Sequence, residues 1–203
     1  MIPDVLNMGA NLIIAASAAT ASVAAVRGLN TWKNQREWEE RRRLALNLAV
    51  AFYKRRDAVR HVRNLFGWSD ETDFDNPNVT DQEKEWYGVS SKYRKRLEKI
   101  VEANQEAYPV NIEAEFVFGP DFKAIEGAVR GLEMELFFAV EDHVASFQPR
   151  SGELRGFESD EARKRNDRII HGTWSEKDEF GTRYTKAFDA VIEFIRWKAE
   201  GEK

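Results

Sequence analysis

The sequence predicts an all-α protein in which an N-terminal transmembrane helix precedes an antiparallel bundle of about four helices. The 203 residues include only 12 glycines and 5 prolines, which is typical of mostly helical proteins. Apolar residues recur at intervals of three, four and seven in four long segments, and no segment alternates like a strand. The opening residues differ in composition from the rest. We therefore expect a membrane anchor at residues 1–29 and a helical bundle domain with some coiled-coil-like spacing at residues 30–203.

The predicted anchor is a run of 22 residues without a formal charge at positions 5–26. As a helix it would be about 33 Å long, which matches a hydrocarbon core of about 30 Å. Half of the run is Ala, Gly or Ser, so its free energy of insertion is modest. A cleavable signal peptide is one alternative, but such peptides carry basic residues before the apolar run, and none precedes it here. A buried Ala-rich helix of a soluble fold is the other.

The basic residues near this run follow it, beginning at Arg27. By the positive-inside rule, we expect a single-pass protein of the inner membrane with its N-terminus outside and its bundle in the cytoplasm. Basic residues next to a negatively charged leaflet each contribute about 1 kcal/mol to binding. We predict that the lipid interface is formed by Trp32, Arg36, Arg41, Arg42 and Arg43. The many small residues in the run would also allow helices to approach closely, so self-association is expected.

The first bundle helix is predicted over residues 31–66, which contain no Gly or Pro. Its apolar stripe is Leu44, Leu48, Phe52, Val59, Val62 and Phe66. The remaining arginines of this helix lie farther from the membrane than a Debye length, which is about 8 Å. They should therefore pair with acids of the next helix or with Asp57. These arginines are Arg55, Arg56, Arg60 and Arg63.

The second helix is predicted to begin with a capping box at residues 80–83 and to end at Pro109. Residues 111–118 are ambiguous between helix and an extended connection. Gly119 and Pro120 begin the third helix, and Ser159 is a candidate cap for a short basic helix that ends at His171. A last helix is predicted over residues 182–200. The apolar stripe of the second helix is Trp86, Ser90, Tyr93, Leu97, Ile100, Asn104 and Ala107. The stripe of the third helix is Phe122, Ile125, Val129, Leu132, Leu136 and Val140, and that of the last helix is Tyr184, Phe188, Val191, Ile192 and Ile195.

Few residues suggest catalysis. The absence of cysteine excludes disulfides, thiolate metal sites and a cysteine nucleophile. No glycine-rich phosphate loop or nucleophile elbow occurs. His61, His143 and His171 are too dispersed in the sequence for a zinc site built from neighbouring ligands. We expect no metal and no cofactor, and the net charge of −4 argues against a protein that wraps nucleic acid.

One short motif suggests an enzyme. Residues 165–171 read RNDRIIH, in which an Arg and a following polar residue precede a His. This motif resembles the signature of the HEPN family, helical-bundle proteins that include metal-independent ribonucleases of toxin and antiviral systems. The resemblance implies that Arg165 stabilises phosphate charge, Asn166 orients the site and His171 acts as acid or base. A surface helix whose terminal His interacts favourably with the helix dipole is the alternative.

A broader resemblance covers much of the chain. The segments GLNTWKNQ at 28–35, AFYKRRDA at 51–58 and VRNLF at 62–66 are similar to uncharacterised bacterial proteins that have one N-terminal span and a helical cytoplasmic domain. This resemblance implies the same architecture and no particular activity. We therefore expect a membrane-anchored, non-enzymatic scaffold that binds lipid and a protein partner or further copies of itself. The alternatives are a HEPN-like ribonuclease, which alone would bind nucleic acid, and an oligomeric membrane effector or pore.

Overall fold

The computed structural model describes residues 2–64, 79–149, 160–172 and 178–200, and the side chains of residues 2–16, 19 and 160 lie outside its description. The predicted all-α class is confirmed, because every element in these residues is an α-helix. The helices are α1 (Ile2–Val62), α2 (Asp81–Phe118), α3 (Pro120–Ser146), α4 (Asp160–Ile170) and α5 (Glu179–Glu200).

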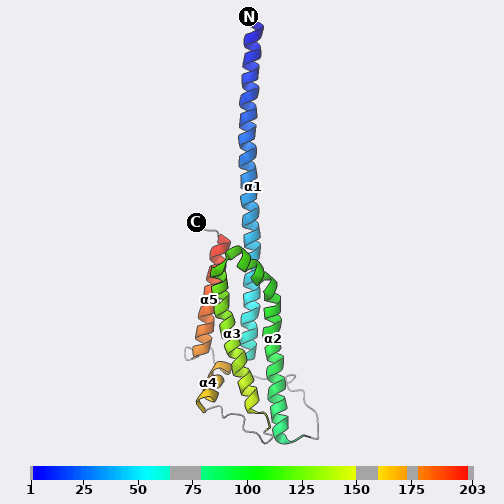
Figure 1. Ribbon diagram of the computed structural model, residues 1–203, viewed down its shortest axis with the longest axis vertical. Coiled ribbons are helices and arrows are strands. Elements are labelled where there is room, and N and C mark those ends of the chain that lie inside the picture. The colour runs from blue at the N-terminus through cyan, green and yellow to red at the C-terminus, as the bar shows by residue number, and fades with distance from the viewer. Residues whose placement is uncertain (1, 65–78, 150–159, 173–177, 201–203) are drawn as a thin grey trace.

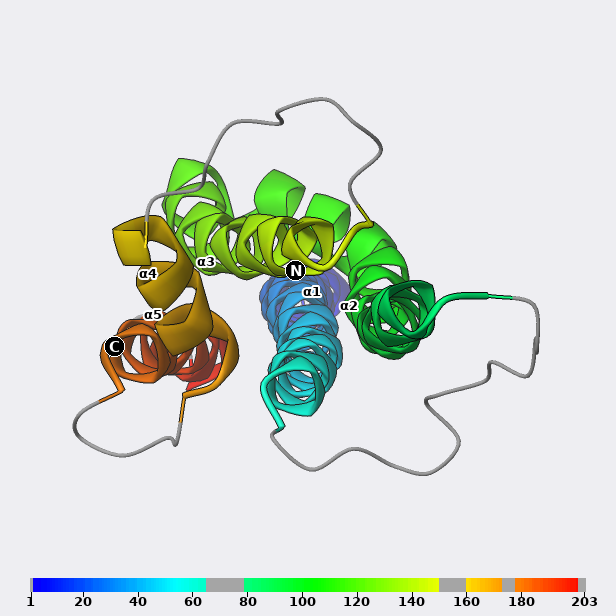
Figure 2. The same ribbon diagram turned by 90° about the horizontal axis from the view of Figure 1, so that it is seen from below.

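The four long helices run alternately up and down and close into a ring (Figures 1 and 2). α1 packs against α2 and α5, and α3 packs against the same two helices from the other side. The short helix α4 contacts α3 and α5 at the end of the bundle that is remote from the N-terminus. This arrangement is an antiparallel four-helix bundle with one added short helix.

The core consists largely of the predicted stripes, as the 3.6-residue period of the helix requires. The stripe of α5 is buried at all five predicted positions, and Leu48, Phe52 and Val59 of α1 are fully buried. In α2 and α3 the predicted Trp86, Ser90, Asn104, Ile125 and Leu132 are only half-buried. Phe66 of the predicted first stripe lies outside the described residues.

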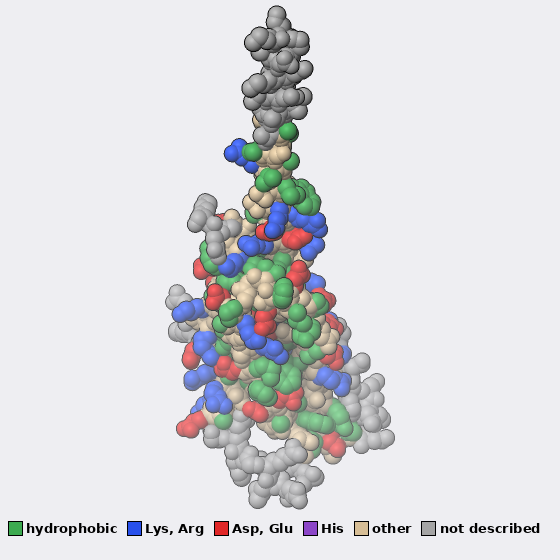
Figure 3. Space-filling view, turned by 45° about the horizontal axis from the view of Figure 1, so that its top comes forward, with side chains coloured by type: hydrophobic (Ala, Val, Ile, Leu, Met, Phe, Trp, Pro, Cys, Tyr) green, Lys and Arg blue, Asp and Glu red, His purple; other side chains and the backbone are tan. Residues whose placement is uncertain are grey.

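α1 is a single helix, whereas the sequence predicted a bundle helix that begins near residue 31. Its first part, residues 2–43, extends beyond the bundle and is called the arm below (Figures 1 and 3). Gly28 does not interrupt the helix, because a glycine in a helix interior costs only about 1 kcal/mol relative to alanine. Every described side chain from position 20 to 43 is exposed, and burial begins at Leu44.

The arm contains the predicted membrane anchor. Positions 5–16 and 19 of the uncharged run lie outside the described side chains. Among the side chains that are described, no helical stretch is both long enough and apolar enough to cross a membrane.

α2 differs from the prediction at its C-terminal end, because it continues through Pro109 to Phe118. A proline in a helix interior lacks an N–H donor and costs about 3 kcal/mol. The burial of Ala114 and the packing of Val110 and Phe118 against the core offset this cost. Figure 1 shows the last part of α2 bending across the end of the bundle, as expected after an internal proline.

The predicted helix starts at residues 80 and 119 are confirmed. The Glu83 backbone N–H donates to Thr80 Oγ1 over 3.3 Å, and the Thr80 backbone N–H donates to Glu83 Oε2 over 2.8 Å, which completes the capping box. Gly119 has a φ of 73°, and Pro120 follows it at the first turn of α3. The proposed cap Ser159 lies outside the described residues.

Candidate functional site

α3 and α4 bring two imidazoles and a carboxylate together at the end of the bundle remote from the arm. One possible ligand atom from each of His143, Asp167 and His171 lies within 4.8 Å of the other two. His143 Nδ1 lies 3.4 Å from Asp167 Oδ1, and the two imidazole centroids are 5.5 Å apart. All three residues are half-buried. The cluster can therefore hold a proton or a cation while remaining accessible to solvent.

The last turn of α4, which carries Asp167 and is followed directly by His171, is held by a buried ion pair. The Arg63 guanidinium donates to both carboxylate oxygens of Asp178 over 2.8 and 2.9 Å, and its Nε donates to the Ile169 carbonyl over 2.7 Å. It thus satisfies a carbonyl at the C-terminal end of α4 that has no partner inside the helix. Gly172 lies directly against Arg63 and Asp178, and a Cβ at this position would clash with both.

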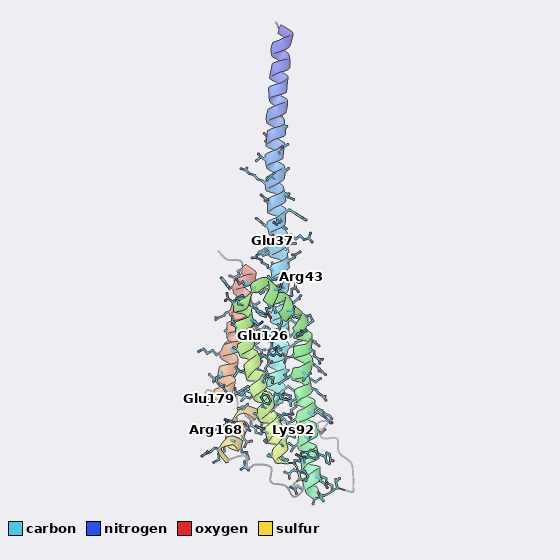
Figure 4. The ribbon with its side chains drawn as sticks, in the orientation of Figure 1. Glu37, Arg43, Lys92, Glu126, Arg168 and Glu179 are labelled. Carbon is cyan, nitrogen blue, oxygen red and sulfur yellow. The ribbon has the colours of Figure 1, made fainter. Side chains whose placement is uncertain are left out.

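α2 supplies aromatic and positive groups beside the cluster. The rings of Tyr93 and His143 meet edge to face with centroids 5.4 Å apart. Burial, followed by the positive charge of His143, lowers the pKa of His171 below its usual value of 6.5, and Lys92 and Arg96 act in the same direction. Figure 4 shows Lys92 near the α4 end of the bundle. These surroundings favour the neutral form of the His171 imidazole, although Asp167 acts to raise its pKa.

The sequence does not predict this cluster, because His143 and His171 are far apart in the chain. One local signal was present: Asp167 and His171 lie four positions apart, which places them on one face of a helix. The His171 backbone N–H donates to the Asp167 carbonyl over 2.8 Å, so the helical spacing persists to His171. The third member comes from the packing of α3 against α4, which the sequence pattern does not specify.

The three residues of the HEPN-like motif lie in different surroundings. Arg165 is exposed on α4, whereas Asn166 is buried and its Nδ2 donates to Asp142 over 3.3 Å. His171 belongs to the cluster described above. The described contacts thus direct Asn166 toward α3, and they do not join Arg165 to His171.

The residues predicted at the lipid interface all lie on the exposed part of the arm. Trp32 is 57% exposed, and the Arg36 guanidinium stacks 5.6 Å from its ring centroid. Arg42 stacks in the same way on Trp38 at 5.2 Å. Figure 4 shows Glu37 on the arm and Arg43 at its base. Arg43 lies 3.7 Å from Glu113 of α2, so the end of this segment already contacts the bundle.

Among the arginines farther along the chain, Arg56 forms an ion pair with the predicted Asp57, and Arg55 and Arg63 form ion pairs with acids that were not predicted. Arg55 is buried and donates to both carboxylate oxygens of Glu133 on α3 over 2.9 and 3.0 Å. Burial acts to lower the pKa of Arg55, but the carboxylates of Glu133 and Glu126 outweigh it and raise that pKa. Arg56 pairs with Asp57 at 3.2 Å, as predicted.

No protein-family model, curated protein or solved structure matches the chain.

Proposed function

We propose that the protein is a non-enzymatic, single-pass protein of the cytoplasmic membrane, and that its bundle is a scaffold held on a helical arm. The observation that carries this proposal is the arm itself. Its described side chains from position 20 onward are exposed all around the helix. The exposed residues include Val23, Val26 and Leu29, whose exposures are 52%, 59% and 63%. A long helix that buries no face within its own chain obtains little stability in water, so it needs a partner.

Lipid is the partner that the charge pattern favours for the first part of the arm. The run at positions 5–26 has no formally charged residue, whereas positions 27–43 contain many charged residues. A boundary of this kind within one helix is expected where the helix leaves the hydrocarbon and enters the headgroup region. The basic residues on the bundle side favour a cytoplasmic bundle and an N-terminus outside.

The continuity of α1 then sets the distance between bilayer and bundle. If Val26 marks the hydrocarbon boundary and the helix follows the membrane normal, Leu44 lies about 27 Å from this boundary. Trp32 lies about 9 Å from it, just beyond a headgroup layer of about 5 to 8 Å, and Arg36 about 15 Å from it, about one Debye length from that layer. We therefore assign the main lipid contacts to these two residues. Arg41, Arg42 and Arg43 lie about 22 to 26 Å away, beyond the range of a screened lipid charge.

The end of the bundle that faces this gap carries exposed apolar side chains. Ile112 and Phe116 are 52% and 91% exposed on the last part of α2, and Trp197 is 48% exposed near the end of α5. Figure 1 shows both helix ends at the base of the arm. We propose that a second copy of this chain covers them, because arms rich in Ala and Ser can approach closely in the membrane and would bring identical bundle ends together.

Two matched substitutions test the anchor. Ile14→Lys places a charge within the uncharged run, where lysine costs about 2.5 to 3.5 kcal/mol in a membrane helix. Asn30→Lys adds the same charge beyond the run. We expect Ile14→Lys to move the full-length protein out of the carbonate-washed membrane pellet and Asn30→Lys to leave it there. If both variants stay in the pellet as the unsubstituted chain does, the run is not the anchor.

A HEPN-like ribonuclease is the second candidate, and one observation favours it. His171 lies beside a second imidazole, that of His143, and a pair of imidazoles can supply both the acid and the base of phosphodiester cleavage. The exposed position of Arg165 gives the ribonuclease candidate no support. Figure 3 shows basic and acidic side chains interspersed on the face in view, and this pattern is not the continuous basic surface that would favour RNA binding. RNA cleavage by the purified chain that is lost in both Arg165→Ala and His171→Ala would favour this candidate over the scaffold.

A further inference from the structure

The scaffold function does not use the cluster of His143, Asp167 and His171, which lies at the far end of the bundle from the arm. We propose that these three side chains form a binding site for a dication of the zinc class. The site would join α3 to the last turn of α4. It does not depend on the membrane proposal, because none of its residues lies on the arm.

The geometry of the cluster is close to that of such a site. Zinc binds imidazole nitrogen at about 2.0 to 2.1 Å and carboxylate oxygen at about 2.0 to 2.2 Å, so neighbouring ligand atoms of a tetrahedral site lie about 3.4 Å apart. His143 Nδ1 and Asp167 Oδ1 are already separated by 3.4 Å. All three ligand atoms lie within 4.8 Å of one another. The longest separation in the set, up to 4.8 Å, would have to shorten by at most about 1.4 Å when the cation binds.

The types of ligand atom select the class of cation. Two imidazoles and one carboxylate suit zinc and its neighbours among the transition metals, whereas calcium and magnesium prefer oxygen ligands alone. Three protein ligands leave one position of a tetrahedral site open. The positive charges of Lys92 and Arg96 act on His171 and oppose a bare dication. A hydroxide, carboxylate or phosphate oxygen in the open position would offset these charges.

The surroundings hold the ligands in place. Arg63 donates to carbonyls of the last turn of α4, including that of Ile169 at 2.7 Å. It thereby fixes the helix that carries Asp167 and that His171 directly follows. The His143 ring contacts the rings of Tyr93 and Phe147 edge to face, with centroid distances of 5.4 and 5.2 Å. Groups that support a ligand in this way restrict its orientation before the metal arrives.

Cobalt(II) titration of the full-length, untagged chain in detergent tests the site, since tetrahedral cobalt reports its ligands by visible absorption. Before titration the protein is stripped of metal with EDTA. We expect one ion per chain and displacement of cobalt by zinc. We expect His143→Gln, His171→Gln and the isosteric Asp167→Asn each to weaken binding by at least about tenfold. His61→Gln is the matched control, because it removes the one histidine outside the cluster, and it should bind as the unsubstituted chain does.

Circular dichroism of each variant shows whether its helices are retained. Should a histidine variant lose helix, Asp167→Asn decides, because it removes a negative ligand with little change in shape. The proposal is overturned if the unsubstituted chain binds no cobalt or zinc at micromolar concentrations. It is equally overturned if folded Asp167→Asn and His61→Gln bind the metal with the same affinity as the unsubstituted chain.

Discussion

Glu133 joins all four long helices at the centre of the bundle. Its carboxylate accepts hydrogen bonds from Arg55 of α1, and also from Asn104 of α2 at 3.1 Å and Tyr184 of α5 at 3.2 Å. Burial, followed by the charge of Glu133, raises the pKa of Tyr184, so this hydroxyl remains a donor. A buried network of this kind is stable only when every member has a partner.

Removal of one partner from the network should therefore be costly. Arg55→Met leaves the carboxylate of Glu133 buried without its cation, which typically destabilises a fold by about 3 to 5 kcal/mol. Arg183→Met is the matched control, because Arg183 makes the same bidentate contact with Glu135 at an exposed site. Glu135 follows Glu133 by two positions on α3. This control should cost at most about 1 kcal/mol. Urea denaturation measures both, and equal losses would contradict a special role for the network.

Single residues show where prediction from sequence reaches its limit. The burial of Phe52 and Val59 followed from helical periodicity, because that pattern depends only on the local backbone. The partner of Arg55 was predicted on the next helix and lies on α3 instead. The association of His143 with His171 was not foreseen. Both contacts depend on which helices are neighbours and on their rotation, and the residue types alone do not determine these.

Among the elements, the caps were predictable and the helix lengths were not. The capping box of α2 is a local motif, so it was readable at Thr80 and Glu83. The continuation of α2 through Pro109 depends on tertiary burial, which overrides the local cost of the proline. The same limitation concerns α1, where the predicted anchor helix and the bundle helix predicted from residue 31 are one uninterrupted helix that begins at Ile2.

The capping box gives a pH-dependent prediction for α2. Hydrogen bonds from the backbone N–H and then the side chain of Thr80 lower the pKa of Glu83 below its usual value of 4.5. Ionised Glu83 thus stabilises the folded state above pH 4.5, and this contribution is lost as the pH falls through the lower pKa of the folded protein. Thr80→Ala should cost about 1 kcal/mol at pH 7 and less at pH 3. Urea midpoints at the two pH values test this, and an unchanged loss would refute it.

The arm gives a second prediction at this scale, because a continuous helix fixes the distance between its ends. Spin labels at cysteines introduced for Ala21 and Gln35 should lie about 21 Å apart along the axis with a narrow distribution. Gly28→Pro should broaden this distribution, since proline removes a hydrogen bond and clashes with the preceding turn. Gly28→Ala should leave it narrow, because a Cβ at Gly28 meets nothing within 4 Å. A broad distribution in the chain with Gly28 would show that the arm is not one rigid helix.

At the scale of the whole molecule, a bundle stabilised by its own core is joined to an arm whose described side chains are all exposed. The bundle buries the predicted stripes and several ionic contacts, including Arg55–Glu133 and Arg63–Asp178. Burial ends abruptly at Leu44. The composition change near residue 29 was visible in the sequence. The continuous helical connection of about 27 Å between the uncharged run and the bundle was not, because it depends on α1 being uninterrupted.

Thiol accessibility in intact cells tests the central claim most directly, because the chain has no cysteine of its own. Single cysteines are introduced at Asp4, Ala15 and Asn34 and treated with a membrane-impermeant maleimide. An anchored arm predicts labelling of Asp4→Cys from outside, labelling of Asn34→Cys only after the membrane is permeabilised, and protection of Ala15→Cys in both states. Labelling of Ala15→Cys as rapidly as Asn34→Cys after permeabilisation would place the uncharged run in water and contradict the account.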